Sequence, residues 1–167
     1  MTNMSEKRIL LTAFRGTSAE VLVTQENIKK RYEILLLPSD KVKDSELLIE
    51  ALKQGHFDYV ISLGQRPNIK GKVHIETRAG KDGEFLDTAF DCASLKDIFE
   101  QNGLPAKLSS NAGTSFCNEL YRNGLMYISE NKLDTKMVFI HVPFVKNISD
   151  MGEFVRRTAT TVENFEG

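Results

Sequence analysis

The chain reads SSNAGTSFCN at residues 109–118 and KMVFIHV at residues 136–142. The second segment is a strongly apolar run, which predicts a buried strand that ends just after His141. Between the two segments we predict a helix over residues 114–131, with Cys117 in its first turn. A thiol at the start of a helix and an imidazole at the end of the next strand are the two halves of a cysteine nucleophile site.

The alternation of strand and helix continues on both sides of this unit. Strands are predicted at residues 8–14, 32–37, 59–63, 72–77 (as an edge strand), 106–109 and 136–142, and helices at 17–30, 44–54, 94–102, 114–131 and 150–165. Residues 78–91 have no clear period and are predicted to be an irregular loop. The pattern indicates an α/β fold, an α/β/α sandwich with a mainly parallel twisted central sheet. We expect a single domain over residues 1–167, with residues 1–7 flexible.

Composition excludes several classes of function. The 167 residues include 41% hydrophobic and 27% charged residues, with a formal net charge of -1. This charge gives no attraction to nucleic acid or to an anionic membrane, so neither is an expected partner. We expect no secretory signal at the start of the chain and we expect Cys92 and Cys117 to be free thiols, which together predict the cytoplasm. His56 and His74 have no metal-ligand spacing and the nucleotide-binding fingerprints are missing, so we predict no metal and no cofactor.

Cys117 and His141 suggest a specific chemistry. A free thiol has a pKa near ~8.5, and the unpaired N–H groups of a helix start favour its thiolate. The same N–H groups can hold the oxyanion of a tetrahedral intermediate, while His141 acts as base and then as acid. On the residues alone, an alternative is equally open, in which Cys117 is a small core residue and His141 a hydrogen-bonded strand-end histidine.

Both segments resemble those of the pyroglutamyl peptidases, a family of cysteine peptidases. The nucleophile motif of that family reads approximately AGT-aromatic-x-CN, against AGTSFCN here, and its histidine motif reads like FIHVPY, against FIHVPF. The 24-residue separation of Cys117 and His141 also agrees. The resemblance covers most of residues 8–145 and identifies a shortened, divergent member. It implies an α/β sandwich and removal of an N-terminal pyroglutamyl residue by a Cys-His-Glu triad.

The third member of that triad is displaced in this sequence. The family places its Glu at the start of the strand segment, where Gly71 or Lys72 stands here. Glu76, a few residues later, is the nearby carboxylate and is our candidate to orient His141. A strand residue that faces solvent is the alternative role for Glu76.

The substrate pocket of the family also differs here. Family members hold the pyroglutamyl ring between two phenylalanines; one position has Ser115 here, and the loop that carries the other is shortened. Phe14 matches a strand-end phenylalanine of the family and is kept as a substrate-binding candidate. Gln65 and Arg78 are further substrate-binding candidates taken from the resemblance. Arg66 is also a substrate-binding candidate, which could meet a substrate carbonyl or simply face solvent. Bacterial members are often tetramers, which implies a homo-oligomer, but the shortened arm after Thr77 leaves the oligomeric state open.

The sequence therefore predicts a cysteine omega-peptidase that acts on a small pyroglutamyl peptide, with Cys117 as nucleophile and His141 as general base. Two alternatives remain open. One is an amidase with a different small substrate, and the other is a catalytically impaired protein that binds a small molecule or peptide on the same scaffold. The retained cysteine and histidine favour an enzyme, whereas the displaced glutamate and the altered pocket favour a binding protein.

Overall fold

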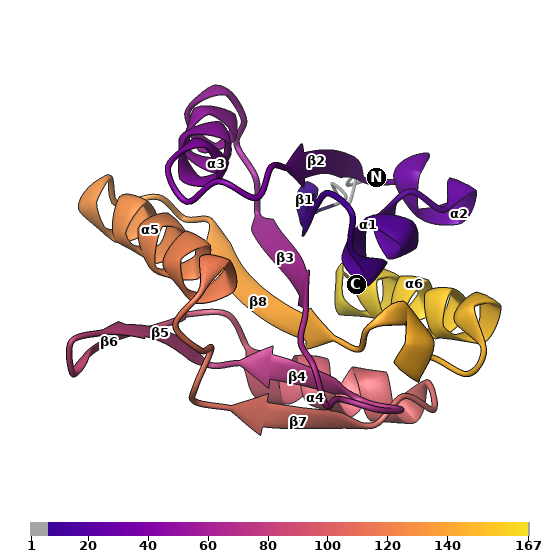
Figure 1. Ribbon diagram of the computed structural model, residues 1–167. Coiled ribbons are helices and arrows are strands. Elements are labelled where there is room, and N and C mark those ends of the chain that lie inside the picture. The colour runs from indigo at the N-terminus through magenta and orange to yellow at the C-terminus, as the bar shows by residue number, and fades with distance from the viewer. Residues whose placement is uncertain (1–6, 167) are drawn as a thin grey trace, which may run out of the picture.

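A sheet of six strands, in the order β2-β1-β3-β8-β4-β7, runs through the described part of the chain (Figure 1). Its strands are β1 (Ile9–Phe14), β2 (Glu33–Leu37), β3 (Tyr59–Gln65), β4 (Val73–Glu76), β7 (Ala106–Ser109) and β8 (Lys136–Val142). The computed structural model describes residues 7–166. Most of the predicted flexible segment, residues 1–6, lies outside the described residues.

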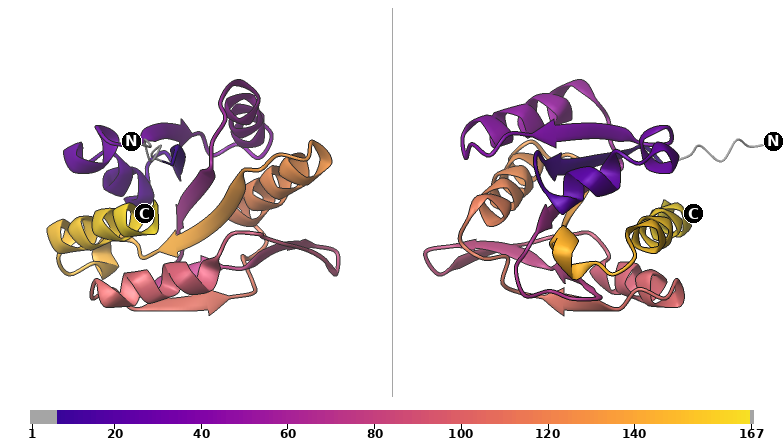
Figure 2. Two further views of the ribbon diagram at one scale, coloured as in Figure 1. Left: turned by 180° about the vertical axis from the view of Figure 1, so that it is seen from behind. Right: turned by 45° about the vertical axis from the view of Figure 1, so that its right-hand side comes forward.

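Helices cover both faces of the sheet. One face packs against α1 (Ser18–Val23), α2 (Glu26–Lys29), α4 (Cys92–Gln101) and α6 (Met151–Glu166). The opposite face packs against α3 (Lys43–Gln54) and α5 (Phe116–Glu130), as the two views of Figure 2 show. The predicted α/β/α sandwich is therefore confirmed. Within residues 7–166, no helix has both the length and the apolar character that a bilayer crossing requires.

The sheet is mainly parallel, but β4 runs against its neighbour β8. The strands β2, β1, β3 and β8 are parallel to one another, and β4 pairs antiparallel with β8 and parallel with β7. The prediction of an edge strand at residues 72–77 was wrong, because β7 pairs with the outer side of β4. The reversed direction brings the carboxyl end of β4 alongside the middle of β8, where Glu76 pairs with Phe139.

The irregular loop predicted at residues 78–91 is in fact a hairpin, β5 (Arg78–Lys81) and β6 (Glu84–Asp87). Its two-residue turn has positive φ at Asp82 (54°) and Gly83 (81°), the conformation for which Asp-Gly is a strong signal.

The helix predicted at residues 17–30 is divided into α1 and α2, and a short 3-10 helix (Val145–Asn147) follows β8. The remaining predicted elements agree with the structure to within three residues at each end, and the strands at residues 106–109 and 136–142 agree at both ends.

Candidate active site

The predicted nucleophile lies over three neighbouring positions in the sheet, one each on β1, β3 and β8. His141 in β8 pairs with Gly64 in β3, and Phe14 follows Ala13, which pairs with Leu63. Gly64 has no side chain, and the sulfur of Cys117 fills the space above it: a Cβ added at Gly64 would lie 2.6 Å from the Cys117 Sγ. Because paired residues of neighbouring strands face the same side, the thiol and the His141 imidazole lie on the same face of the sheet.

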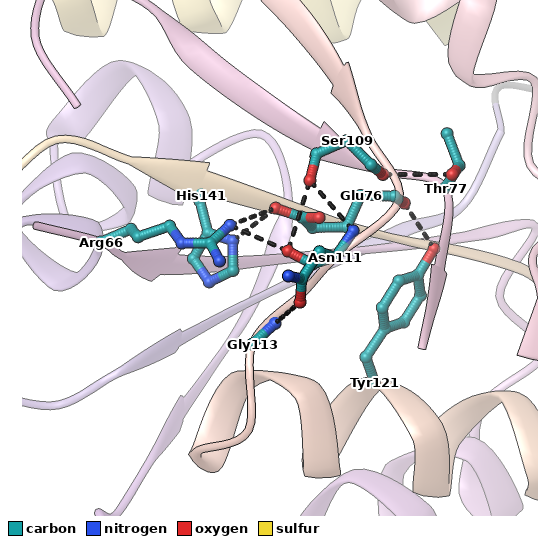
Figure 3. A network of polar contacts seen from close by, with 8 residues as sticks. All are labelled: Arg66, Glu76, Thr77, Ser109, Asn111, Gly113, Tyr121 and His141. Atoms are coloured by element: carbon teal, nitrogen blue, oxygen red, sulfur yellow. Dashed lines mark hydrogen bonds and ion pairs between the residues drawn. The ribbon is translucent and has the colours of Figure 1, made fainter. Parts of the chain in front are cut away.

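A carboxylate contacts the other side of the imidazole (Figure 3). The Nδ1 atom of His141 lies 2.7 Å from Oε2 of Glu76, and both side chains are buried. Glu76 reaches His141 because β4 is antiparallel to β8. The same Oε2 lies 3.2 Å from Nη1 of Arg66, which also donates to the Asn111 carbonyl at 3.0 Å. Tyr121, from α5, donates its hydroxyl to the Glu76 carbonyl at 2.8 Å.

The loop before α5 is shaped by its own side chains. The Asn111 side chain accepts a hydrogen bond from the Gly113 N–H at 3.0 Å, a local turn that asparagine favours. Gly113 has a φ of 90°, which a residue with a side chain adopts at a cost. The helix then starts at Phe116, and the Ser115 side chain makes no capping bond. Cys117 is thus in the first helical turn, where N–H groups lack partners within the helix.

The thiol itself is less acidic than the sequence suggested. Burial raises the pKa of Cys117 to about 12; the Arg66 charge opposes this, while the charges of Glu76 and Asp44 add to it. In the part of the chain that the structure describes, no hydrogen bond joins this thiol to His141, although such contacts are often long before a substrate binds. The expected depression of the pKa was therefore wrong for the unliganded protein, because burial outweighs the helix start.

Comparison with known proteins finds similarity to one family of peptidases. A family model described as pyroglutamyl peptidase matches residues 88–155, a range that contains Cys117 and His141. Pyrrolidone-carboxylate peptidase 2 of Caldanaerobacter subterraneus is 28% identical over 83% of this chain and 82% of its own length. The pyrrolidone-carboxylate peptidase of Staphylococcus carnosus is also 28% identical, over 83% of this chain and 79% of its own length.

Solved structures show the same fold. Pyroglutamyl peptidase I from Bacillus amyloliquefaciens superposes with a TM-score of 0.82 at 19% identity, covering 97% of this chain and 96% of that one. The pyrrolidone carboxyl peptidase of Thermococcus litoralis gives a TM-score of 0.76 at 17% identity, over 94% and 92% of the two chains. The chain is thus similar to the pyroglutamyl peptidase family both in sequence and in fold. The matched range begins after Glu76, so the carboxylate is located by geometry alone.

The aromatic pair near the pyroglutamyl peptidase motif does not form a sandwich. Phe14 is buried in the core, and its ring meets Phe116 edge to face, with centroids 6.2 Å apart and planes at 63°. The Lys41 ammonium lies 5.7 Å from the centroid of the Phe116 ring. Two rings packed edge to face leave no parallel slot for a flat lactam ring. Phe14 therefore lies near the predicted nucleophile, on the strand next to Gly64, but its buried ring is not open to a ligand.

Two other predicted site residues line separate clefts. Gln65 ends β3 and accepts the Ser18 N–H at 3.1 Å, beside a cleft of about 530 Å³ at the carboxyl ends of the parallel strands. Arg78 stacks over Phe85 at 3.7 Å and borders a cleft of about 440 Å³ between the hairpin and residues 110–114. The structure thus brings together Cys117, His141, Glu76 and Arg66, whereas Gln65 and Arg78 line two other clefts.

Sequence reasoning missed three residues around the site. Tyr121 is one helical turn after Cys117, a spacing that predicts a shared face. Asn118 clamps the hairpin by bonding both the N–H (3.0 Å) and the carbonyl (2.7 Å) of Gly80, which no sequence signal indicates. Asp44 in α3 is fully buried, and burial raises its pKa to about 6. Within residues 7–166, no group of three His, Cys, Asp or Glu side chains is arranged to hold a metal ion.

Proposed function

We propose that this protein is a cysteine peptidase that removes an N-terminal pyroglutamyl residue from a small peptide. The observation that carries the proposal is the 2.7 Å contact between Nδ1 of His141 and Oε2 of Glu76. It is buried and lies on the face of the sheet that also holds the Cys117 sulfur. A nucleophile, a base and a group that orients the base are the parts that thiol-based acyl transfer requires. The names of the relatives support the substrate class.

In the proposed mechanism, Glu76 holds the imidazole with its proton on Nδ1, so that Nε2 is free to accept the proton of Cys117. The sulfur attacks the carbonyl carbon of the pyroglutamyl residue, and the unpaired N–H groups at the start of α5 stabilise the oxyanion. His141 then gives the proton to the departing amine of the peptide. A water molecule, deprotonated by His141, hydrolyses the thioester and releases pyroglutamate.

Because the pKa of Cys117 is about 12, proton transfer to His141 accompanies attack, as with the hydroxyl of a serine enzyme. This differs from peptidases that keep a preformed thiolate and imidazolium pair. The proposal therefore assigns His141 the role of a true general base.

A second candidate function is favoured by the aromatic pair. Since Phe14 and Phe116 pack edge to face, a lactam ring has no parallel slot between them. An amidase with another small substrate, or a catalytically impaired binding protein, would tolerate this packing. The retained contact between His141 and Glu76 favours an enzyme over the binding protein, because a ligand-binding scaffold has no need of a buried, oriented base.

The proposed partner is a small peptide. A homo-oligomer stays a prediction from the family resemblance, which light scattering on the purified protein would test. The cytoplasm also stays the predicted location, and the free thiols of Cys92 and Cys117 agree with a reducing compartment.

The test is hydrolysis of a fluorogenic pyroglutamyl amide by wild type, Cys117→Ala and Cys92→Ala. We expect Cys117→Ala to lower kcat by about 10⁶-fold, as loss of a nucleophile does in a triad enzyme. Cys92→Ala is the matched control, because Cys92 is also buried and free but lies on the opposite face of the sheet. Activity that survives in Cys117→Ala, or an inactive wild type with an intact fold, would reject the proposal. Cleavage of a different small N-acyl amide instead would select the amidase.

A further inference from the structure

We infer that Arg66 is a positioning residue that joins the Glu76 carboxylate to the loop before the nucleophile. The inference rests on the proposed function, since the roles of Glu76 and Cys117 are part of it. It assigns Arg66 a role different from the substrate contact predicted from the sequence. Three sets of contacts carry it, and Figure 3 shows the contacts of the Arg66 side chain with Glu76 and Asn111.

A single nitrogen of Arg66 bridges two elements of the site. Its Nη1 lies 3.2 Å from Oε2 of Glu76 and 3.0 Å from the carbonyl oxygen of Asn111. The Glu76 carboxylate comes from β4, and Asn111 belongs to the loop that leads into α5. The guanidinium therefore fixes the distance between the group that orients His141 and the segment that carries Cys117.

The backbone of Arg66 is held by a third element. Its N–H donates to the carbonyl of Val142 at 3.0 Å, directly after His141 in β8. The side chain thus starts from a point fixed beside the base. Because a guanidinium is planar and rigid, it holds its contacts in a defined geometry better than an ammonium would.

The positive charge of Arg66 also supports this role. Glu76 is fully buried, and its Oε1 has no hydrogen-bond partner among the described residues. A buried carboxylate needs an opposite charge to remain ionised, and a neutral imidazole supplies none. Arg66 is the cation in contact with it, at 27% side-chain exposure. An ionised Glu76 is what keeps the His141 proton on Nδ1, so the Arg66 charge acts on the base through Glu76.

The contacts of Arg66 with the loop before α5 support the role as well. Nη2 of Arg66 would lie 3.8 Å from a Cβ at Gly113, so the guanidinium lies against the turn that precedes α5. Asn111 accepts from Arg66 through its carbonyl while its side chain holds the Gly113 N–H. Loss of the guanidinium would leave the Asn111 carbonyl with the longer contact from the Ser109 hydroxyl, at 3.3 Å. The turn could then shift, and with it the N–H groups proposed for the oxyanion.

A positioning role and a substrate-binding role predict different kinetics. Loss of a contact made equally in ground and transition states raises KM and leaves kcat unchanged. Loss of positioning lowers kcat, since a displacement of about 1 Å at the reacting groups costs about 100-fold. For Arg66→Ala we expect kcat to fall about 100-fold with KM unchanged. Arg66→Lys should recover only part of the loss, because it restores the charge without the planar fork.

The kinetic experiment has a matched control and a chemical rescue. Arg157→Ala is the control, because Arg157 also joins a carboxylate, that of Glu153 at 3.0 Å, to a loop carbonyl, that of Gly103 at 2.6 Å, but belongs to α6 on the opposite face of the sheet. We expect it to keep the kcat of wild type. Guanidinium ion at non-denaturing concentration should raise kcat of Arg66→Ala, whereas sodium ion at equal ionic strength should not. A raised KM at unchanged kcat for Arg66→Ala would overturn the inference, as would failure of guanidinium to rescue.

A double-mutant cycle measures the energetic coupling between Arg66 and Glu76 even if the protein cleaves no pyroglutamyl substrate. The free energy of unfolding is measured for wild type, Arg66→Ala, Glu76→Gln and the double variant. If Arg66 compensates the buried carboxylate, Arg66→Ala destabilises the wild type more than it destabilises Glu76→Gln. Equal destabilisation in both backgrounds would overturn the inference. An inactive wild type with a positive coupling would reject the proposed function and retain the link between Arg66 and Glu76.

Discussion

Glu76→Gln is expected to lower kcat by about 10⁴-fold, the loss seen when the orienting carboxylate of a serine triad is replaced by its amide. A glutamine fits the same space, but its NH₂ group can donate to Nδ1 of His141. The proton of the imidazole then moves to Nε2, the atom that must accept the proton of Cys117. KM should change little, because Glu76 is fully buried and offers no surface to a substrate.

The fold should survive this substitution. Replacing a buried charge with a neutral group of equal size often changes stability little, and here one carboxylate oxygen already lacks a partner. Glu119→Gln is the matched control, because Glu119 is also close to Cys117 in α5 but is partly exposed and pairs with Lys41 rather than with His141. Thermal unfolding measured beside kcat separates the two effects. If kcat of Glu76→Gln stays within about 10-fold of wild type, His141 is not oriented by Glu76 in the way that triads require.

Gly64→Ala is expected to lower kcat by about 100-fold, because the added methyl group displaces the nucleophile. Its carbon would lie 2.6 Å from the Cys117 Sγ and 2.8 Å from the Cζ of Phe139. Neither neighbour can move away freely, since the sulfur is held by α5 and the ring is buried in the core. Overpacking of this kind also costs about 1–3 kcal/mol of stability.

Gly152→Ala supplies the comparison for this experiment. At Gly152, in the first turn of α6, the nearest atom to an added Cβ is 3.6 Å away, and alanine is the better helix former. This variant should keep wild-type kcat and stability or gain slightly in stability. A Gly64→Ala enzyme with wild-type kcat would show that the sulfur does not react from its position above Gly64.

The sequence alone was sufficient for the part of the site that lies close together along the chain. Cys117 and His141 belong to one strand-helix-strand unit, so local motifs and their spacing could predict that they meet. Apolar periodicity also predicted the sandwich, because each helix and strand carries its own buried face.

The orientation of Glu76 could not be predicted from the sequence, because it depends on a pairing between strands that are far apart along the chain. Whether it faces His141 or solvent is decided by the antiparallel register of β4 against β8, in which His74 pairs with His141. No local pattern specifies that register. Arg66 was proposed for the site, but its contacts depend on the same pairing.

The prediction of a loop at residues 78–91 and the prediction of a lowered pKa for Cys117 were wrong for different physical reasons. The strands of the hairpin are only four residues each, too short for alternation to be seen, although the Asp82-Gly83 turn was a usable signal. The pKa of Cys117 depends on burial by Gly64, Phe139 and the rest of the core, which a helix start in the sequence does not reveal.

The most direct test of the central claim is the mass of the protein during turnover. Wild type is mixed with a pyroglutamyl ester, quenched in acid within the first turnover and digested for peptide mass spectrometry. We predict a gain equal to one pyroglutamyl group on the peptide that contains Cys117, slow loss of that gain in Glu76→Gln, and none on the peptide that contains Cys92. Hydrolysis of the ester with Cys117 unmodified at every time point would contradict the account.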